Sequence, residues 1–324
     1  MNDNTDKNNF SILTKKDVLI LQKLLEDGRK SSSCISKEID LGREIVNYRI
    51  KRLIKENLII KFIPKINDKV LNYKEYIILL KLNLEDDISK EKFIKEHIGN
   101  KYLVWVIKSK SGWDLVVRLY AKSVEEFKEK MSEVLENYSE VLAKYYTIIS
   151  TDEIKSDEKE LLSKNLFEKT KKNDFKVIKE EEKQILDEKN SEILHLLEED
   201  GRIQYKEIGE KLNISSDTVK YRIEKMKSQG ILENIVPVLN YNKLGYLQYA
   251  CILKFLFLNS IQESQVSEFI NSNKHILKAI KSLNTSEYFL TLAFENQKDI
   301  IEFEKGCKIL FEEKLDSIEI FKID

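Results

Sequence analysis

Cysteine, histidine and proline are scarce in this sequence. Its 324 residues include three cysteines, three histidines and two prolines. The cysteines are odd in number and far apart, which argues against both a disulfide framework and a cysteine-based zinc site. His97, His195 and His275 are isolated, and no Ser/His/Asp, Cys/His or phosphate-loop spacing occurs. The sequence therefore predicts no enzyme, no metal site and no cofactor.

The sequence also lacks a large net charge and a long apolar segment. Lys+Arg 55 against Asp+Glu 56 leave a formal charge of -1, so any nucleic-acid footprint must be a local basic surface. The most apolar run, Tyr249 to Leu258, is too short to span a bilayer and contains Lys254. The polar start, MNDNTDKNNF, lacks the apolar core of a signal peptide and predicts a disordered tail. We expect a cytoplasmic protein without a membrane partner.

What is present is an internal repeat. Gly28 and Gly201 are 173 residues apart in the sequence. Without a gap, the same offset relates Tyr48 to Tyr221, Arg49 to Arg222, Pro64 to Pro237, Tyr73 to Tyr246, and Ile107-Lys108-Ser109 to Ile280-Lys281-Ser282. A match over this range indicates two copies of one architecture.

The first part of each copy has the pattern of three helices and a turn. In copy one, apolar residues at helical spacing lead to Asp27-Gly28, where glycine can end the helix in the left-handed conformation. Serines suited to capping precede the second helix, and Ser215 is the expected N-cap of the third helix in copy two. The expected helices lie at 34–39 and 43–56, and at 193–199, 205–212 and 216–229. The runs LIIKFIP and ILENIVP then predict a small β-hairpin, or wing, in each copy.

The rest of each copy changes to strand patterns. Copy one has alternating or apolar runs at 76–84, 102–108, 115–120 and 141–149, with amphipathic helices near 90–97 and 124–137. The order βαββαβ predicts a ferredoxin-like domain, and residues 247–323 support the same plan. Because the two helices cover one face of each sheet, the other face needs a partner sheet.

These motifs resemble those of the Lrp/AsnC (feast/famine) transcription regulators. The matching stretches are LLEDGR and LLEEDGR, VNYRIKRL and VKYRIEKM, the segments reaching Pro64 and Pro237, and SGWDLVVRL. The resemblance covers nearly the whole chain and implies an α+β fold, a tandem repeat of a winged helix-turn-helix plus a ferredoxin-like (βαββαβ) sensing domain. Because family members dimerise sheet against sheet, the halves are expected to form an intramolecular pseudo-dimer, open to further homo-oligomerisation.

The expected domains follow from the repeat. The junction after copy one mixes Lys with Asp and Glu and contains neither Gly nor Pro, which predicts a largely helical, solvated linker. The boundaries are a tail at 1–12, winged helix-turn-helix domains at 13–65 and 186–238, sensing domains at 66–150 and 239–324, and the linker at 151–185.

Double-stranded DNA is the expected partner of the third helix of each copy. With Val46, Ile50 and Leu53 inward, the helical period turns the polar residues outward. Arg49 and Arg222 lie at the edge of the buried stripe. At this position an arginine can form either a structural ion pair or a contact with a DNA phosphate, and the sequence does not decide between them. The candidate DNA-binding residues are Arg43, Glu44, Asn47, Tyr48, Arg49, Lys51, Arg52 and Lys55 in copy one, and Ser216, Asp217, Lys220, Tyr221, Arg222 and Lys225 in copy two.

Charge differs between these two segments. Residues 43–65 carry seven basic and two acidic side chains, whereas residues 215–238 carry four basic and three acidic ones. Since phosphate attraction grows with the number of cationic contacts, copy one is expected to supply most of the nonspecific affinity.

The resemblance also implies a small-molecule effector such as an amino acid. Its candidate loop is Ser111, Gly112, Trp113 and Asp114. Gly112 is also typical of a hairpin and Trp113 of an interface aromatic. Copy two lacks the glycine, which puts a second effector site in doubt.

Two alternatives to a regulator stay open. Siroheme decarboxylases resemble this family and consist of two related subunits, so a tetrapyrrole enzyme is one alternative on fold analogy. An interaction scaffold that has lost DNA binding is the other, above all for copy two.

Overall fold

Two compact units make up the structure, and each takes residues from both copies. The computed structural model describes residues 13–84, 86, 88–90, 92, 105–109, 111–156, 186–284 and 286–323. The helix-turn-helix unit contains the described residues up to Asn72 in copy one and up to Gly245 in copy two, and the sheet unit begins at Tyr73 and at Tyr246. The predicted tail and most of the predicted helix near 90–97 lie outside the described residues.

The helix-turn-helix unit contains three helices from each copy. They are α1 (Lys15–Glu26), α2 (Ser32–Glu38) and α3 (Arg43–Lys55), then α7 (Glu188–Glu199), α8 (Tyr205–Leu212) and α9 (Ser216–Ser228). The predicted serine caps are present, since Ser31 accepts from the Cys34 N–H and Ser215 accepts from the Thr218 N–H. The helical prediction is therefore confirmed in both copies, although α7 begins at Glu188 and not at the predicted residue 193.

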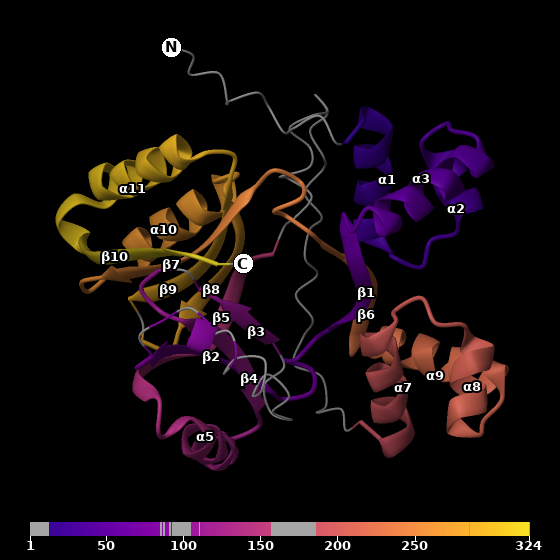
Figure 1. The fold of residues 1–324 in the computed structure, drawn as a ribbon, viewed down its shortest axis with the longest axis horizontal. Helices are drawn as coiled ribbons and strands as arrows, with labels where there is room; N and C mark the ends of the chain where they lie inside the picture. Colours follow the sequence, from indigo (N-terminus) through magenta and orange to yellow (C-terminus); the bar gives the residue numbers. More distant parts are fainter. Residues whose placement is uncertain are drawn as a thin grey trace. The chain divides into compact units, whose positions relative to one another are not determined.

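A strand follows each set of helices, and the two strands pair with each other. β1 (Ile59–Ile66) and β6 (Leu232–Leu239) form a two-stranded antiparallel sheet, with the helices of the two copies on either side of it (Figure 1). The expected hairpin within each copy is therefore wrong. Ile63 pairs with Val236, its equivalent 173 residues later, so an approximate two-fold axis passes through this pair.

Backbone contacts join the copies next to this sheet. The Gly28 N–H donates to the Ile235 carbonyl at 2.6 Å, and the equivalent Gly201 N–H donates to the Phe62 carbonyl at 2.9 Å. Arg29 donates to the Gly201 and Ile203 carbonyls, and Arg202 donates to the Gly28 carbonyl at 2.6 Å. Gly28 does not have a positive φ, so its predicted left-handed role is wrong. Glycine is needed there because a Cβ would lie 2.8 Å from the Ile235 carbonyl oxygen.

The sheet unit contains eight strands and the helices that cover them. The strands are β2 (Lys74–Leu82), β3 (Trp105–Lys108), β4 (Leu115–Ala121), β5 (Leu142–Ser156), β7 (Leu247–Phe255), β8 (Ile276–Ser282), β9 (Glu287–Phe294) and β10 (Leu315–Lys322). Their spatial order is β10-β7-β9-β8-β5-β2-β4-β3. Each copy thus supplies a four-stranded ferredoxin-like sheet in the expected order. The described helices are α5 (Val124–Tyr138), α10 (Ser260–Ser272), α11 (Gln297–Phe311) and the short 3-10 turn η2 (Glu312–Lys314).

The two four-stranded sheets pack face to face inside the unit. Alternation along β2 turns Ile77 and Leu79 toward the other sheet, while Ile78 and Leu80 lie in the separate core of copy one. In copy two, Ala250 and Ile252 of β7 join the shared core with Phe289. Figure 1 shows α5 on one outer side of the strands and α10 and α11 on the other. The expected intramolecular packing of sheet on sheet is present, and further self-association stays a prediction.

Hydrogen bonds also join the two sheets at their edges. The second half of β5 pairs with β8, from Ser150 opposite Ser282 to Ser156 opposite Lys278. Lys155 is buried there and donates to the Asn273 carbonyl at 2.8 Å, near the end of α10. The linker therefore does not begin at residue 151, because β5 continues to Ser156; residues 157–185 lie outside the described part.

The unit boundaries fall a few residues later than predicted. Asn67 donates to the Ile231 carbonyl and Asn240 to the Leu58 carbonyl, so the segments after both strands stay with the helix-turn-helix unit. In the part of the chain that the structure describes, no helix has the length and apolar character needed to cross a membrane.

Candidate nucleic-acid interface

The outer face of α3 is polar and accessible. Its inward residues Val46, Ile50 and Leu53 are buried, as predicted from the helical period. Tyr48 is 67% exposed, and Arg43, Glu44, Lys51 and Lys55 are exposed along the same helix. The α3 face therefore offers one large aromatic and several cations to a polyanion, held in place by a packed apolar stripe.

A buried carboxylate holds two arginines at the edge of this face. Asp17 of α1 has no exposed surface, and its carboxylate oxygens accept from Arg49 at 2.9 Å and from Arg52 at 2.8 Å. Arg49 also donates to the Thr14 hydroxyl at 2.8 Å. The outward orientation predicted for Arg52 is thus wrong, because its guanidinium is drawn to a charge 35 residues earlier in the chain. For Arg49, a structural ion pair and a phosphate contact were both open, and the structure shows the ion pair, with Asp17.

The pKa of Asp17 lies below its ordinary value of 3.8. Burial alone would raise the pKa, but the hydrogen bonds from Thr14 and Arg49 and the charge of Arg52 outweigh burial. A carboxyl group whose pKa is lowered by folding stabilises the folded state above its unfolded pKa. This stabilisation is lost as the pH falls through the folded-state pKa.

Replacing Asp17 with asparagine is expected to destabilise the helix-turn-helix unit by about 1.5–3 kcal/mol at pH 7, because two arginines lose their charged partner. Asparagine is the residue at the equivalent position of copy two, Asn190, so the substitution is compatible with the fold. Urea unfolding at several pH values checks this. The difference from the natural protein should stay constant at neutral pH and shrink as the pH falls below about 4 and through the lowered pKa of Asp17; a difference that does not shrink at acidic pH would contradict the assignment.

In copy two, the equivalent arginine also pairs with a carboxylate, but the acidic residue stands at a different position. Arg222 donates to the Asp187 carboxylate at 2.7 Å and to the Asn190 side-chain oxygen at 3.1 Å. Asp187 is the N-cap of α7, as Thr14 is of α1. Arg49 and Arg222 of the Tyr-Arg-Ile motifs therefore bind residues at the start of the first helix of their own copy. These contacts set the position of the third helix, α3 or α9, which we call the recognition helix.

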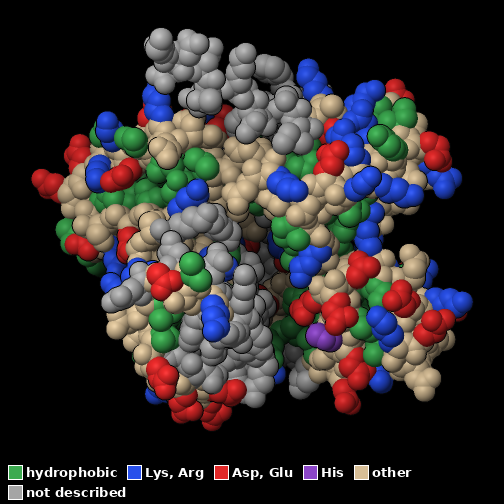
Figure 2. Space-filling view, in the orientation of Figure 1, with side chains coloured by type: hydrophobic (Ala, Val, Ile, Leu, Met, Phe, Trp, Pro, Cys, Tyr) green, Lys and Arg blue, Asp and Glu red, His purple; other side chains and the backbone are tan. Residues whose placement is uncertain are grey.

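The outer face of α9 has a different charge pattern from that of α3. Tyr221 is 64% exposed, nearly the same as Tyr48. Ser216, Asp217, Lys220 and Lys225 are also exposed, and the Lys220 ammonium lies 3.9 Å from Glu224. Figure 2 shows Lys and Arg side chains grouped over the first helix-turn-helix, and acidic and basic side chains mixed over the second.

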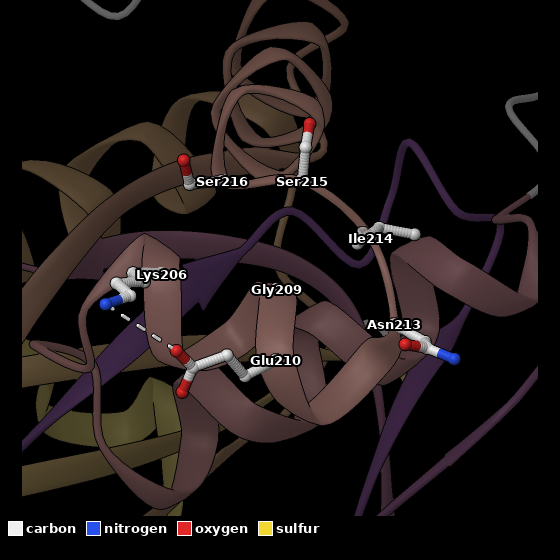
Figure 3. Close-up of a pocket in the computed structure, with 7 residues that line it drawn as sticks. All are labelled: Lys206, Gly209, Glu210, Asn213, Ile214, Ser215 and Ser216. Carbon is white, nitrogen blue, oxygen red and sulfur yellow. Dashed lines mark ion pairs between the residues drawn. The ribbon is translucent and has the colours of Figure 1, made fainter.

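A shallow pocket lies at the turn between α8 and α9. Figure 3 shows its lining, with the Lys206 and Glu210 ion pair on α8 and the start of α9 above it. Asn213 adopts φ 60° to make the turn, and a Cβ on Gly209 would lie 2.5 Å from the Ile214 carbonyl oxygen. The lining residues are Lys206, Gly209, Glu210, Asn213, Ile214, Ser215 and Ser216. This close turn places the beginning of α9 at the surface, where a helix-turn-helix contacts a DNA backbone.

The candidate effector loop is partly used by the fold. Trp113 is 7% exposed in the core shared by the two sheets, and Asp114 accepts from the Leu82 N–H at 2.8 Å. The ammonium groups of Lys81 and Lys90 lie 3.3 and 3.1 Å from the Asp114 carboxylate. Gly112 has φ 73°, as a turn glycine should. Trp113 and Asp114 therefore have structural contacts, and the exposed part of the loop is Ser111 and Gly112.

Copy two has a related buried acid. Glu287, the equivalent of Asp114, is 2% exposed and accepts from the Tyr146 hydroxyl of copy one at 2.6 Å. The Lys254 ammonium lies 3.6 Å from the same carboxylate. This cluster joins the two copies at the sheet interface rather than repeating the glycine-containing loop.

The described histidines show no arrangement typical of a catalytic group. His195 of α7 has a side chain that is 71% exposed, near Glu198 and Glu199. His275 places Nδ1 3.1 Å from the Ala293 carbonyl and stacks on Phe294. His97 lies outside the described residues. Among the described residues, no group of three or more His, Cys, Asp or Glu side chains could hold a metal ion.

Sequence reasoning missed three residues that position this interface. Arg29 and Arg202 lie within the repeated LLEDGR and LLEEDGR motifs, so the repeat itself marked them, although it did not reveal contact between copies. Asp17 differs from its equivalent Asn190, so the repeat could not mark it.

Comparisons with known proteins identify the helix-turn-helix of copy two. Residues 186–227 match the AsnC-type helix-turn-helix domain. An uncharacterized HTH-type transcriptional regulator of Pyrococcus furiosus is 31% identical over 115 residues, which are 36% of this chain and 76% of that protein. The HTH-type transcriptional regulator LrpB of Bacillus subtilis is 32% identical over 107 residues, 33% of this chain and 70% of LrpB.

Solved structures of a siroheme decarboxylase are similar over nearly the whole chain. The crystal structure of the siroheme decarboxylase NirDL matches with a TM-score of 0.63 and 13% sequence identity, covering 95% of this chain and 90% of that one. At this identity, the similarity shows a shared tandem fold and carries no residue roles.

Proposed function

Because the chain belongs to the Lrp/AsnC family of DNA-binding transcription regulators, we propose that it recognises specific DNA sequences through α3 and α9 and changes its DNA binding when a small molecule is present. The observation that carries the first part is the α3 face. It exposes Tyr48, Lys51 and Lys55 on a helix that Asp17 fixes through two ion pairs. A rigid, accessible, cationic helix suits insertion into a DNA groove.

Selection of binding sites from a random pool of duplex DNA tests sequence-specific recognition. The full-length chain is expected to enrich one motif that survives an excess of unrelated competitor DNA. The Tyr48→Ala variant, altered at a fully outward side chain, should weaken binding to the motif more than binding to unrelated DNA. Recovery of random sequences, or of no DNA, would count against the proposal.

The proposed effector is an amino acid at the turn formed by Ser111 and Gly112. Here copy one contacts β10 of copy two. The Lys322 N–H donates to the Ser111 hydroxyl, and Ser109 forms an isolated antiparallel β-bridge with Ile323. Glu319 of β10 is exposed, and its carboxylate oxygen lies 3.6 Å from the position of a Cβ on Gly112. A carboxylate beside an open glycine can accept the ammonium group of an amino acid.

Calorimetric titration with each of the twenty amino acids checks this prediction, followed by DNA-affinity measurements with any binder. We expect one chemical class to bind and to change the DNA affinity. Glu319→Gln should remove both responses, because it removes the charge that pairs with the ammonium, while leaving DNA affinity without ligand unchanged. A response that is the same in this variant would move the effector site elsewhere.

We propose that the chain is a regulator and not a siroheme decarboxylase, although its tandem fold resembles NirDL. This proposal is supported by the recognition helices α3 and α9, whose Tyr48 and Tyr221 side chains are 67% and 64% exposed. Mixing the protein with siroheme under anaerobic conditions tests it. An unchanged absorption spectrum and unchanged substrate are expected, and turnover would overturn the proposal.

A further inference from the structure

The two recognition helices belong to one body and have different faces. We propose that the DNA target of this chain is an asymmetric site, two unequal half-sites that bind α3 and α9 in a single orientation. This inference rests on the proposed recognition of DNA and names the kind of site recognised.

Contacts between the two copies hold α3 and α9 in a fixed relation. β1 and β6 pair about Ile63 and Val236, which are equivalent residues, so the two copies are related by an approximate two-fold axis. Reciprocal backbone bonds from Gly28 and Gly201 tie each copy to the strand of the other. The same axis relates the outer faces of α3 and α9, so a duplex that binds both helices carries its two half-sites in inverted orientation.

Part of the outer face is the same on α3 and α9. Tyr48 and Tyr221 occupy equivalent positions and are 67% and 64% exposed. Arg49 and Arg222 hold the two helices by ion pairs to the first helix of each copy. Both copies therefore present the same aromatic from a similarly fixed helix, and we expect the tyrosines to make the same contact in both half-sites.

The rest of the outer face differs between α3 and α9. One helical turn after each tyrosine, copy one has Lys51 and copy two has Glu224, both exposed. Lysine donates hydrogen bonds and suits the acceptor edge of guanine, whereas a carboxylate accepts and suits the amino group of cytosine. At the corresponding position, the half-site under α3 should carry guanine and the half-site under α9 cytosine. Lys55 opposite Ser228 and Arg43 opposite Ser216 increase the difference in charge.

The consequence is a bound complex with polarity. Two identical copies would read a palindrome equally in both orientations. Here, turning the protein end to end would place Lys51 over the cytosine and Glu224 over the guanine, so both contacts would meet the wrong base. A site with two mismatched positions should bind at least about tenfold more weakly.

The test is the symmetry of the selected motif, followed by an exchange of charges. The natural chain should prefer its selected site at least about fivefold over either palindrome built from one half-site, because each palindrome has one mismatched position. The double variant Lys51→Glu with Glu224→Lys keeps the total charge, and it should move the guanine preference to the other half-site. The matched control, Lys298→Glu with Glu302→Lys, exchanges an exposed pair on α11 of the sheet unit and should leave the motif unchanged.

Orientation can be read directly from the natural cysteines. Cys34 of α2 is exposed, whereas Cys251 and Cys307 are buried. A DNA-cleaving iron chelate attached to Cys34 should cut next to the guanine half-site only. Cutting next to both half-sites, a palindromic motif, a motif with a single half-site, or a preference unchanged by the exchange would each overturn the asymmetric site while leaving DNA recognition intact. Failure to enrich any sequence would instead remove the proposed function itself.

Discussion

Replacing Gly201 with alanine is expected to unfold the helix-turn-helix unit at temperatures where the sheet unit stays folded, and to remove DNA binding with it. A Cβ at this position would lie 2.8 Å from the carbonyl carbon and oxygen of Phe62. These are backbone atoms of β1, which pairs with β6, so they cannot turn aside as a flexible side chain would. Overpacking of this kind costs about 1–3 kcal/mol, and the rigid neighbour places the expected loss at the upper end.

The structure explains why the effect of this alanine should spread. The Gly201 N–H donates to Phe62, and the Gly201 carbonyl accepts from Arg29 of copy one. Displacing this backbone therefore breaks contacts in both copies at once. Thermal unfolding followed by circular dichroism, together with DNA binding by fluorescence anisotropy, measures the outcome.

The matched control for this alanine is Gly306→Ala on α11. A Cβ there meets nothing within 4 Å, so the change should stabilise its helix by about 0.5–1 kcal/mol and leave DNA binding as it is. If Gly201→Ala unfolds like the natural protein, the close approach between copies is not a requirement of the fold.

The helices and strands of this chain follow from local patterns, whereas the pairing of its copies does not. Val46, Ile50 and Leu53 recur at helical spacing, and this period alone predicts the buried side of α3. The run LIIKFIP predicts a strand with equal force whether its partner is a neighbouring segment or the other copy. Only the tertiary structure distinguishes these cases, which is why the hairpin prediction was wrong.

Long-range ion pairs set a similar limit for the interface. Arg52 has the spacing of an outward residue, and its partner Asp17 comes 35 residues earlier in a different helix. No helical period can relate the two. The end of β5 shows the same limit in a strand, since the polar residues after Ser150 have the composition of a linker and become a strand through pairing with β8. Sequence reasoning thus predicted the helix that forms the interface but not which of its cations are already paired.

The second prediction with a large effect concerns the two exposed lysines of α3. Removing Lys51 and Lys55 together by alanine substitution is expected to weaken DNA binding about a hundredfold or more, because each charge-assisted contact contributes about 1.5–3 kcal/mol. With Lys55 on a phosphate and Lys51 on a base, the slope of log affinity against log salt concentration should fall in magnitude by about 0.9. Both side chains are exposed on α3, so the free energy of unfolding should change little.

Two comparison variants separate this effect from a loss of structure. Arg52→Ala leaves the buried Asp17 with one cation fewer, so it should lower the unfolding midpoint and leave the salt slope nearly unchanged in the folded protein. Lys220→Ala with Lys225→Ala removes the outward cations of α9, where Lys220 lies near Glu224, and should weaken binding less than the α3 pair. Equal losses from the α3 and α9 pairs would mean that both copies hold the DNA backbone equally. The lower charge of copy two would then have no consequence for affinity.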